Sequence, residues 1–147
     1  MKYKKVLIAI DNTDEADEVV SAAKDIVGDS GASLSLITVI TPMVYAYGLE
    51  YGMMTSGTLS IEEEAADLAR QNQAALEAKF GIQCDKSVVI GHPAHEIRNL
   101  AESNDADLIV IGSHGRHGLG LLLGSTATGV LHGAPCDVHV VRIKAGG

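Results

Sequence analysis

Short apolar runs alternate along the chain with stretches in which apolar residues recur every three or four positions. Continuous apolar runs are typical of strands buried on both faces, whereas the three-to-four spacing is typical of helices with one buried face. The runs predict strands over residues 6–10, 34–40, 88–90, 108–111 and 138–143. The helical spacing predicts helices that begin near residues 12, 60, 93 and 125.

Residues that favour helix ends flank these segments. Asn12 and Thr13 are the cap candidates of the first helix, and Glu15 stands three residues after Asn12. Glu63 follows Ser60 at the same spacing, which is that of a capping box in which two side chains satisfy backbone N–H groups. Pro93 suits the first position of a helix. Gly81 is expected just beyond a helix end, since glycine adopts the backbone conformation that closes a helix.

The regular alternation of strand and helix predicts an α/β fold in one domain that spans residues 1–147. Such a domain has a doubly wound parallel sheet with right-handed crossovers and helices on both faces. Ligands of these sheets bind at the carboxyl ends of the strands where the strand order reverses. Asp11 and Gly112, which follow the first and fourth strands, would meet there if those strands are neighbours.

The composition fits an α/β domain, and the net charge argues against one class of partner. The chain is 46% hydrophobic but only 3% aromatic, so its core must be built from valine, isoleucine, leucine and alanine. A net charge of −8 argues against general binding of nucleic acid, which needs a basic surface. The two cysteines, 52 residues apart and outside any CxxC pair, indicate reduced thiols and a cytoplasmic location. No signal peptide and no apolar run long enough for a membrane span is found, so we expect no membrane association.

A glycine-dense segment follows the fourth predicted strand and carries the strongest chemical signal. Its pattern is Gly112-x2-Gly115-x8-Gly124-Ser125, which is neither a Walker loop nor a dinucleotide fingerprint. Glycines let the backbone approach an anion closely, and a helix start supplies unpaired N–H groups. The segment therefore predicts a phosphate site. The alternative is a surface loop with an ordinary helix start at Gly124.

The segment over residues 42–58 holds three of the four tyrosines and three of the four methionines, without a regular period. Loops of this length are usually functional or mobile. The sequence leaves two interpretations open, a mobile crossover and a ligand lid or interface.

Neither a metal site nor a catalytic set emerges from the polar residues. His92 and His95 are three residues apart, as are His114 and His117, but no cysteine or carboxylate cluster accompanies them. No Ser-His-Asp set can be assembled, and Ser125 is better suited to cap a helix or bind phosphate than to act as a nucleophile. We therefore expect no metal and assign no catalytic residue.

Several motifs, taken together, resemble the universal stress protein family over the whole chain. They are KVLIAID at 5–11, LITV at 36–39, GHP at 91–93, ADLIVIGSHG at 106–115, LLGS at 122–125 and APCDV at 134–138. The resemblance implies a five-stranded parallel sheet in the order 3-2-1-4-5, a nucleotide-binding fold and a homodimer. The family includes members that bind ATP and members that do not. Its ATP pattern is Gly-x2-Gly-x9-Gly-Ser/Thr, and the last spacing is one residue shorter here.

The resemblance also implies the roles of individual residues toward ATP, ADP or AMP. Asp11 would lie near the base and ribose, and Val39 would contact adenine through its backbone. Gly112 and Gly115 would let the loop pass close to the ribose and phosphates. The groups implied at the phosphates are those of Gly124, Ser125 and Thr126. Arg116 lies inside the loop, where its charge could pair with phosphate or remain solvated.

Three functions follow as hypotheses. The favoured one is an ATP-binding regulatory protein of the stress response, acting with a protein partner that the sequence does not identify. The alternatives are a nucleotide-independent homodimeric adaptor and a slow ATP hydrolase, for which the sequence offers no evident base beyond Asp11. We expect the homodimer to join through the last strand, residues 138–143, because it lies at a sheet edge in the implied order.

Overall fold

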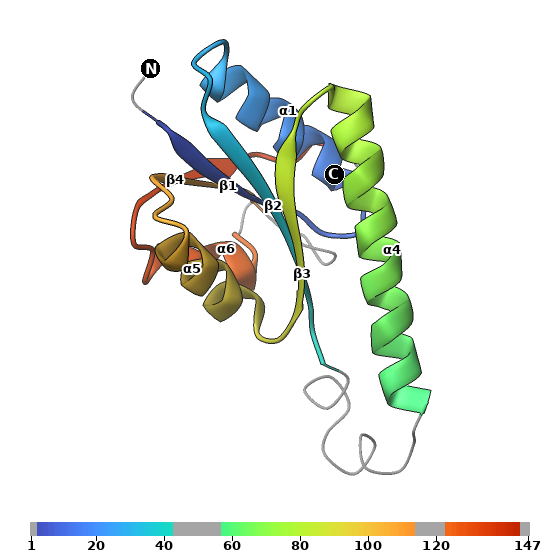
Figure 1. Cartoon of the computed structure of the whole chain (residues 1–147). Coiled ribbons are helices and arrows are strands. Elements are labelled where there is room, and N and C mark those ends of the chain that lie inside the picture. Colours follow the sequence, from blue (N-terminus) through green and yellow to red (C-terminus); the bar gives the residue numbers. More distant parts are fainter. Residues whose placement is uncertain (1–2, 43–56, 114–122, 145–147) are drawn as a thin grey trace.

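The core of the protein is a parallel sheet of five strands in the order β3-β2-β1-β4-β5 (Figure 1), as predicted. The computed structural model describes residues 3–42, 57–113 and 123–144. The strands are β1 (Lys5–Ala9), β2 (Ser33–Ile40), β3 (Cys84–Ile90), β4 (Leu108–Gly112) and β5 (Asp137–Val141). The helices of the described residues are α1 (Glu15–Val27), α4 (Gly57–Phe80), α5 (Pro93–Ser103) and α6 (Ser125–Leu131).

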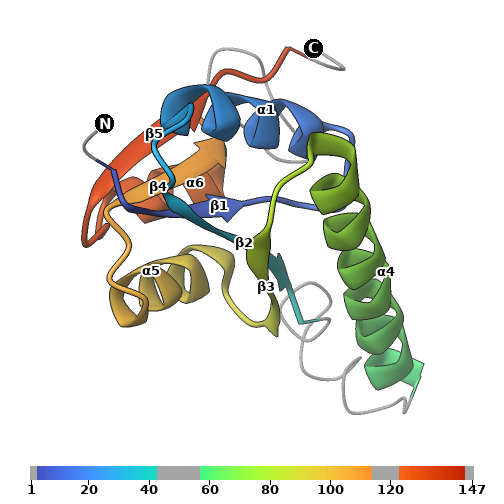
Figure 2. The same ribbon diagram turned by 45° about the horizontal axis from the view of Figure 1, so that its top comes forward.

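Helices cover both faces of the sheet, with α1 and α5 on opposite sides (Figure 2). Alternate residues of β1 pack into the hydrophobic cores on the two faces of the sheet. Val6 and Ile8 pack in a core cluster with α1 and α4, and Leu7 and Ala9 pack in a second cluster with α5 and α6. Residues 6–9 of β1 and 108–111 of β4 are therefore apolar at every position, so their sequences are continuous apolar runs rather than alternating ones.

The strand order reverses between β1 and β4. The chain proceeds from β1 to β2 and β3 on one side and then returns to place β4 on the other side of β1. Ala9 pairs with Ile37 of β2 and with Ile111 of β4. Since all strands are parallel, the segments that follow β1, β2 and β4 leave the sheet at the same end.

The predicted elements deviate mainly at the two edges of the sheet. β3 begins at Cys84 rather than at residue 88, because an edge strand has an exposed side and accepts polar residues such as Asp85 and Lys86. β5 ends at Val141, two residues earlier than predicted. Residues 142–144 follow β5, and Lys144 N donates to Glu18 Oε1 of α1 at 3.0 Å.

Two expected helix caps are wrong. α4 begins at Gly57, so Ser60 lies inside the helix rather than at its cap. Asn12 does not cap α1, whose N-cap is Asp14. The amide of Asn12 instead donates to Ala65 O at 3.4 Å and its oxygen accepts from Asn72 at 3.2 Å, so it joins the end of β1 to α4.

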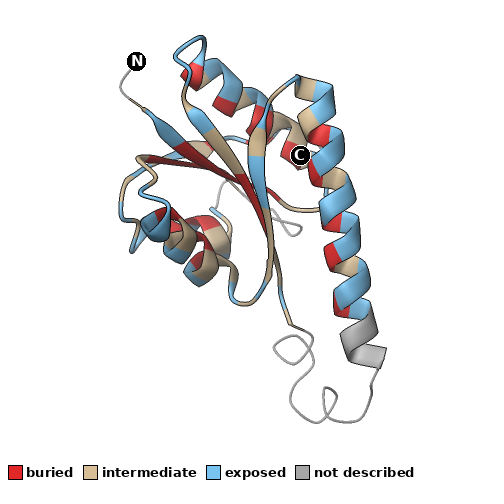
Figure 3. Cartoon of the chain, in the orientation of Figure 1, coloured by how far each residue is buried: buried red, intermediate tan, exposed pale blue. Residues whose placement is uncertain are grey.

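A buried glutamine fastens α4 to the sheet. Gln73 is 1% exposed, and its Nε2 donates to Thr38 Oγ1 at 3.1 Å and to Ser87 O at 2.8 Å. Figure 3 shows that the buried positions of α4 lie on the side that faces the sheet. A buried amide without partners would cost free energy, so these bonds fix how the helix sits over β2 and β3.

The other layer depends on a close approach between α5 and α6 at Gly129. A Cβ placed on Gly129 would lie 2.7 Å from Ala94 Cβ, which is too short for two methyl carbons. Arg98 Nη1 also donates to Gly129 O at 2.6 Å. A side chain at residue 129 would therefore push α6 away from α5.

We expect Gly129→Ala to lower the free energy of unfolding by about 1–3 kcal/mol, the usual cost of overpacking. Alanine has the higher helix propensity, so propensity alone predicts the opposite sign. The control is Thr128→Ala on the exposed side of the same helix. Urea unfolding of both variants measures the effect. A Gly129→Ala protein as stable as Thr128→Ala would contradict the close packing.

Candidate functional site

Three of the predicted residues lie at the carboxyl ends of adjacent strands. Asp11 follows β1, Val39 is in the last part of β2, and Gly112 ends β4. Two residues beyond the pairs that Ala9 makes with Ile37 and Ile111, Asp11 is level with Val39 and with the residue after Gly112. The structure thus brings these three positions to the reversal of strand order, where parallel sheets bind ligands.

The carboxylate of Asp11 is held by the turn that leads into α1. Its Oδ1 accepts from Thr13 N at 3.1 Å and from Thr13 Oγ1 at 2.6 Å. Thr13 Oγ1 in turn accepts from Glu15 N at 3.3 Å, in the first turn of α1. The half-buried carboxylate therefore has a fixed orientation at the end of β1.

Gly112 has a packing role that the sequence did not predict. A Cβ at this position would lie 3.2 Å from Ile143 Cδ1 and 3.4 Å from Val19 Cγ2. The side chain of Ile143, which is 5% exposed, therefore covers this glycine. The close packing of Ile143 and Val19 thus disfavours a side chain at residue 112 independently of any ligand.

The two ends of the glycine loop are joined. Gly124 N donates to Ser113 O at 2.7 Å, so the chain returns to the point at which it left β4. Gly124 is extended, with φ −64° and ψ 160°, and is the N-cap of α6. Ser125 and Thr126 follow in the first turn of that helix, at the position predicted. Gly115 and Arg116 lie outside the described residues.

Ser113 is a residue that sequence analysis missed. Besides accepting from Gly124, it donates its N–H to Val141 O at 2.8 Å, and its Oγ accepts from Ile143 N at 3.1 Å. Its place directly after a buried strand and next to Gly112 was the available signal. The contact with the end of the chain had no signal in the sequence.

The described part of the chain has neither a metal-binding cluster nor a thiol with a lowered pKa. No group of three or more histidine, cysteine, aspartate or glutamate side chains is placed to hold a metal ion among the described residues. Burial and the nearby Glu77 carboxylate raise the pKa of the Cys84 thiol to about 11, and burial raises the pKa of Cys136. Both thiols are therefore protonated at neutral pH and weakly nucleophilic.

Two further predictions concern residues outside the described ranges. The tyrosine- and methionine-rich segment falls almost entirely within residues 43–56, and His114 and His117 fall within 114–122, outside the described ranges. In the described part of the chain, no helix is both long and apolar enough to cross a membrane.

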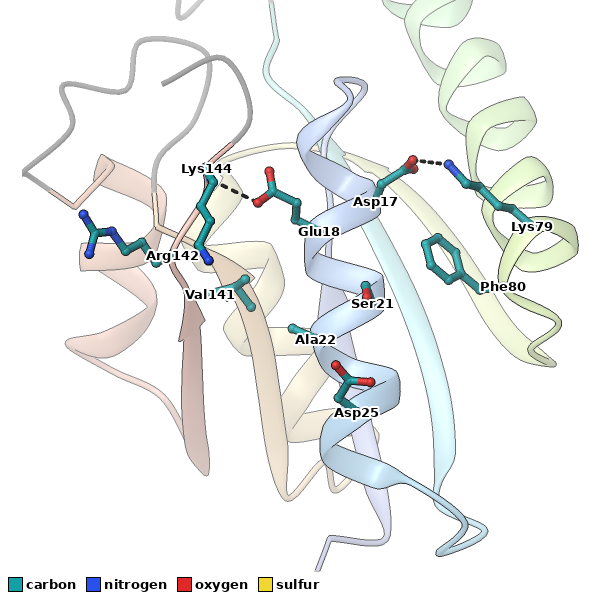
Figure 4. Close-up of a pocket in the computed structure, with 10 residues that line it drawn as sticks. All are labelled: Asp17, Glu18, Ser21, Ala22, Asp25, Lys79, Phe80, Val141, Arg142 and Lys144. Carbon is teal, nitrogen blue, oxygen red and sulfur yellow. Dashed lines mark hydrogen bonds and ion pairs between the residues drawn. The ribbon is translucent and has the colours of Figure 1, made fainter.

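An open hollow lies elsewhere, between α1, the end of α4 and residues 141–144 (Figure 4). Its rim mixes charges of both signs, including an ion pair between Asp17 and Lys79. Lys144 N donates to Glu18 Oε1 at 3.0 Å on its other side. The hollow does not include Asp11, Val39 or Gly112, and we do not assign the site to it.

The fold and the motifs have counterparts among known proteins. The model of the universal stress protein family matches residues 2–142. Universal stress protein A homolog 2 of Coxiella burnetii is 37% identical over 144 residues, which cover 97% of each chain. The solved structure of universal stress protein UspA from Lactobacillus plantarum has a TM-score of 0.75 at 26% identity and covers 97% of this chain and 99% of its own.

A structure of a universal stress protein in complex with cAMP has the same fold. Its TM-score is 0.70 at 24% identity, with 98% of this chain and 100% of that chain covered. The family model matches nearly the full length and the Coxiella burnetii relative is 37% identical, so the chain belongs to the universal stress protein family.

Proposed function

We propose that this universal stress protein binds an adenine nucleotide, ATP, at the carboxyl ends of β1, β2 and β4, and regulates a stress response according to the nucleotide bound. The observation that carries the proposal is the reversal of strand order between β1 and β4, which gathers Asp11, Val39 and the joined glycine loop. The charge of −8 is no obstacle, because backbone N–H groups can hold a phosphate without basic side chains.

Each part of the nucleotide has a suitable neighbour in this arrangement. The carboxylate of Asp11 would accept from ribose hydroxyls, and the backbone of Val39 would meet the adenine edge. The N–H groups and hydroxyls of Gly124, Ser125 and Thr126 would face the phosphates at the start of α6. Gly112 and Gly115 would keep the loop close to the ligand, and Arg116 would add a positive charge.

The length of the loop and the fold bear on which nucleotide binds. The one-residue difference from the ATP pattern falls between Gly115 and Gly124, so it leaves the join between Ser113 and Gly124 in place. A structure of this fold was solved with cAMP, which supports an adenine nucleotide by analogy of fold.

We place the protein in the cytoplasm, in keeping with two free cysteines.

A nucleotide-independent adaptor and a slow ATP hydrolase are the alternatives. Hydrolysis requires a group that activates water, and Asp11 is the carboxylate of the proposed site. Its Oδ1 already accepts two bonds from Thr13. This geometry favours a role in orienting the ribose over a role as a base, so we propose binding rather than turnover.

We expect Gly124→Val to weaken ATP binding by about tenfold or more, because a side chain would displace phosphate from the backbone N–H groups. The control is Thr128→Val, which places a valine on the exposed side of α6 and should bind ATP as tightly as the unmodified protein does. Isothermal titration calorimetry measures both affinities. Absence of ATP binding by the unmodified protein at millimolar nucleotide would overturn the proposal and favour the adaptor.

We also propose that the protein is a homodimer in which the β5 edges of two copies pair. β5 lies at the edge of the sheet and pairs only with β4 among the described strands. Val141 O accepts from Ser113 N of the chain segment after β4, so the backbone groups of the preceding residue, Val140, point outward. Antiparallel pairing about a two-fold axis would satisfy the outward groups.

Val140→Pro tests this pairing, because it removes an outward N–H while the inward bonds to β4 remain. We expect the unmodified protein to scatter light as twice the 15.3 kDa chain mass, and the proline variant as a monomer. Val140→Thr keeps the N–H and should remain dimeric. A monomeric unmodified chain would refute the homodimer, and a dimeric proline variant would move the interface away from β5.

A further inference from the structure

Ser113 joins three segments that are distant in the sequence. It directly follows β4, its carbonyl accepts from Gly124 N at 2.7 Å, and its hydroxyl accepts from Ile143 N at 3.1 Å. Its own N–H donates to Val141 O at 2.8 Å. One half-buried residue thus contacts both the far end of the glycine loop and the end of the chain.

The Ser113 hydroxyl accepts the hydrogen bond that the Ser113 carbonyl would accept in a regular parallel ladder. The last pair between β4 and β5 is Gly112 with Val141. If the ladder continued, Ser113 N–H would donate to Val141 O, and Ile143 N–H would donate to Ser113 O. The first bond is present, but Ile143 N–H donates to the Ser113 hydroxyl instead. The Ser113 carbonyl is thereby left for Gly124 N–H.

Residues 143 and 144, next to this bond, have further contacts with α1 and the core. Ile143 is 5% exposed and packs in the core cluster of the α1 face, over Gly112. Lys144 N donates to Glu18 Oε1 at 3.0 Å, and Figure 4 shows the two residues side by side at α1. The hydroxyl of Ser113 therefore connects the loop base to a segment that is anchored at two further points.

We propose that Ser113 is a positioning residue: by accepting from Ile143 N–H, its hydroxyl keeps the Ser113 carbonyl bonded to Gly124 N–H and so keeps Gly124 placed for the proposed nucleotide site. The proposal rests on the proposed nucleotide site. Without the hydroxyl, Ile143 N–H would turn to the Ser113 carbonyl, as in a regular ladder, and a carbonyl shared between two donors would hold Gly124 N–H less firmly. The loop base would then open more often, although no group that touches the nucleotide has been removed.

The test compares Ser113→Ala with Ser113→Thr, which keeps the hydroxyl. Ser103→Ala is the matched control, because the Ser103 hydroxyl makes one bond, to Leu100 O at 3.2 Å, at the end of α5. Amide hydrogen exchange in the nucleotide-free protein follows Gly124 and Ile143. Calorimetry follows ATP affinity.

In Ser113→Ala we expect exchange to accelerate at Ile143 and also at Gly124, by about threefold to tenfold, as the loss of one hydrogen bond implies. ATP affinity should fall by a similar factor. Ser113→Thr should restore both, and Ser103→Ala should change neither. Faster exchange at Gly124 is the decisive readout, since the alanine removes no partner of that amide.

Unchanged exchange at Gly124 in Ser113→Ala would overturn the proposal, as would faster exchange with unaltered ATP affinity. If the unmodified protein does not bind ATP, the proposed function fails. The exchange at Gly124 then still decides whether the hydroxyl positions the loop base.

Discussion

Parallel strands covered on both faces leave a protein few places for chemistry, and the rest of this structure depends on that constraint. Leu7, Ile8, Ile109 and Val110 are at most 1% exposed, and the β1 and β4 residues have helices on either side. Backbone groups within the sheet are used by the ladder. The two covered faces therefore offer a ligand no free backbone groups, whereas such groups are found where the strands end, and ligands of parallel sheets bind at the end where the strand order reverses, here between β1 and β4.

The chain uses one short stretch to build the proposed site and the proposed dimer edge. From β4 it passes through the glycine loop, α6 and β5, and it returns at Ile143 to the residue that follows β4. Ser113 joins the start and the end of this stretch through the hydrogen bonds of its backbone and its hydroxyl. Because β5 and the two ends of the glycine loop meet at Ser113, the proposed nucleotide site and the proposed dimer edge share the same hydrogen bonds.

Local patterns in the sequence were sufficient to predict the strands, the helices and the parallel sheet. The strand order, and with it the meeting of Asp11 and Gly112, followed only from the resemblance to the universal stress protein family. Continuous apolar runs predicted the central strands, and regular alternation predicted the parallel sheet. The edge strands were less well bounded, since β3 begins with polar residues whose side chains face solvent. Asn12 was misjudged because its partners, Ala65 and Asn72, belong to a distant helix.

The same distinction explains what was missed at the site. Gly112 was assigned to ligand approach, but its packing against Ile143 depends on where the end of the chain runs after β5. Ser113 was missed because its role comes from two residues, Gly124 and Ile143, that only the folded chain brings to it. Local patterns predict elements, whereas contacts between the ends of elements require the three-dimensional structure.

The central claim is that an adenine nucleotide binds where β1, β2 and β4 end. The most direct measurement is the change in backbone amide NMR shifts when ATP is added to the unmodified protein. The account predicts that the largest changes cluster at Asp11, Val39, Gly112 and Gly124, with little change at the opposite end of the sheet, near Lys5 and Asp107. Largest changes at the hollow beside Asp17 and Lys79, or no changes at saturating ATP, would contradict it.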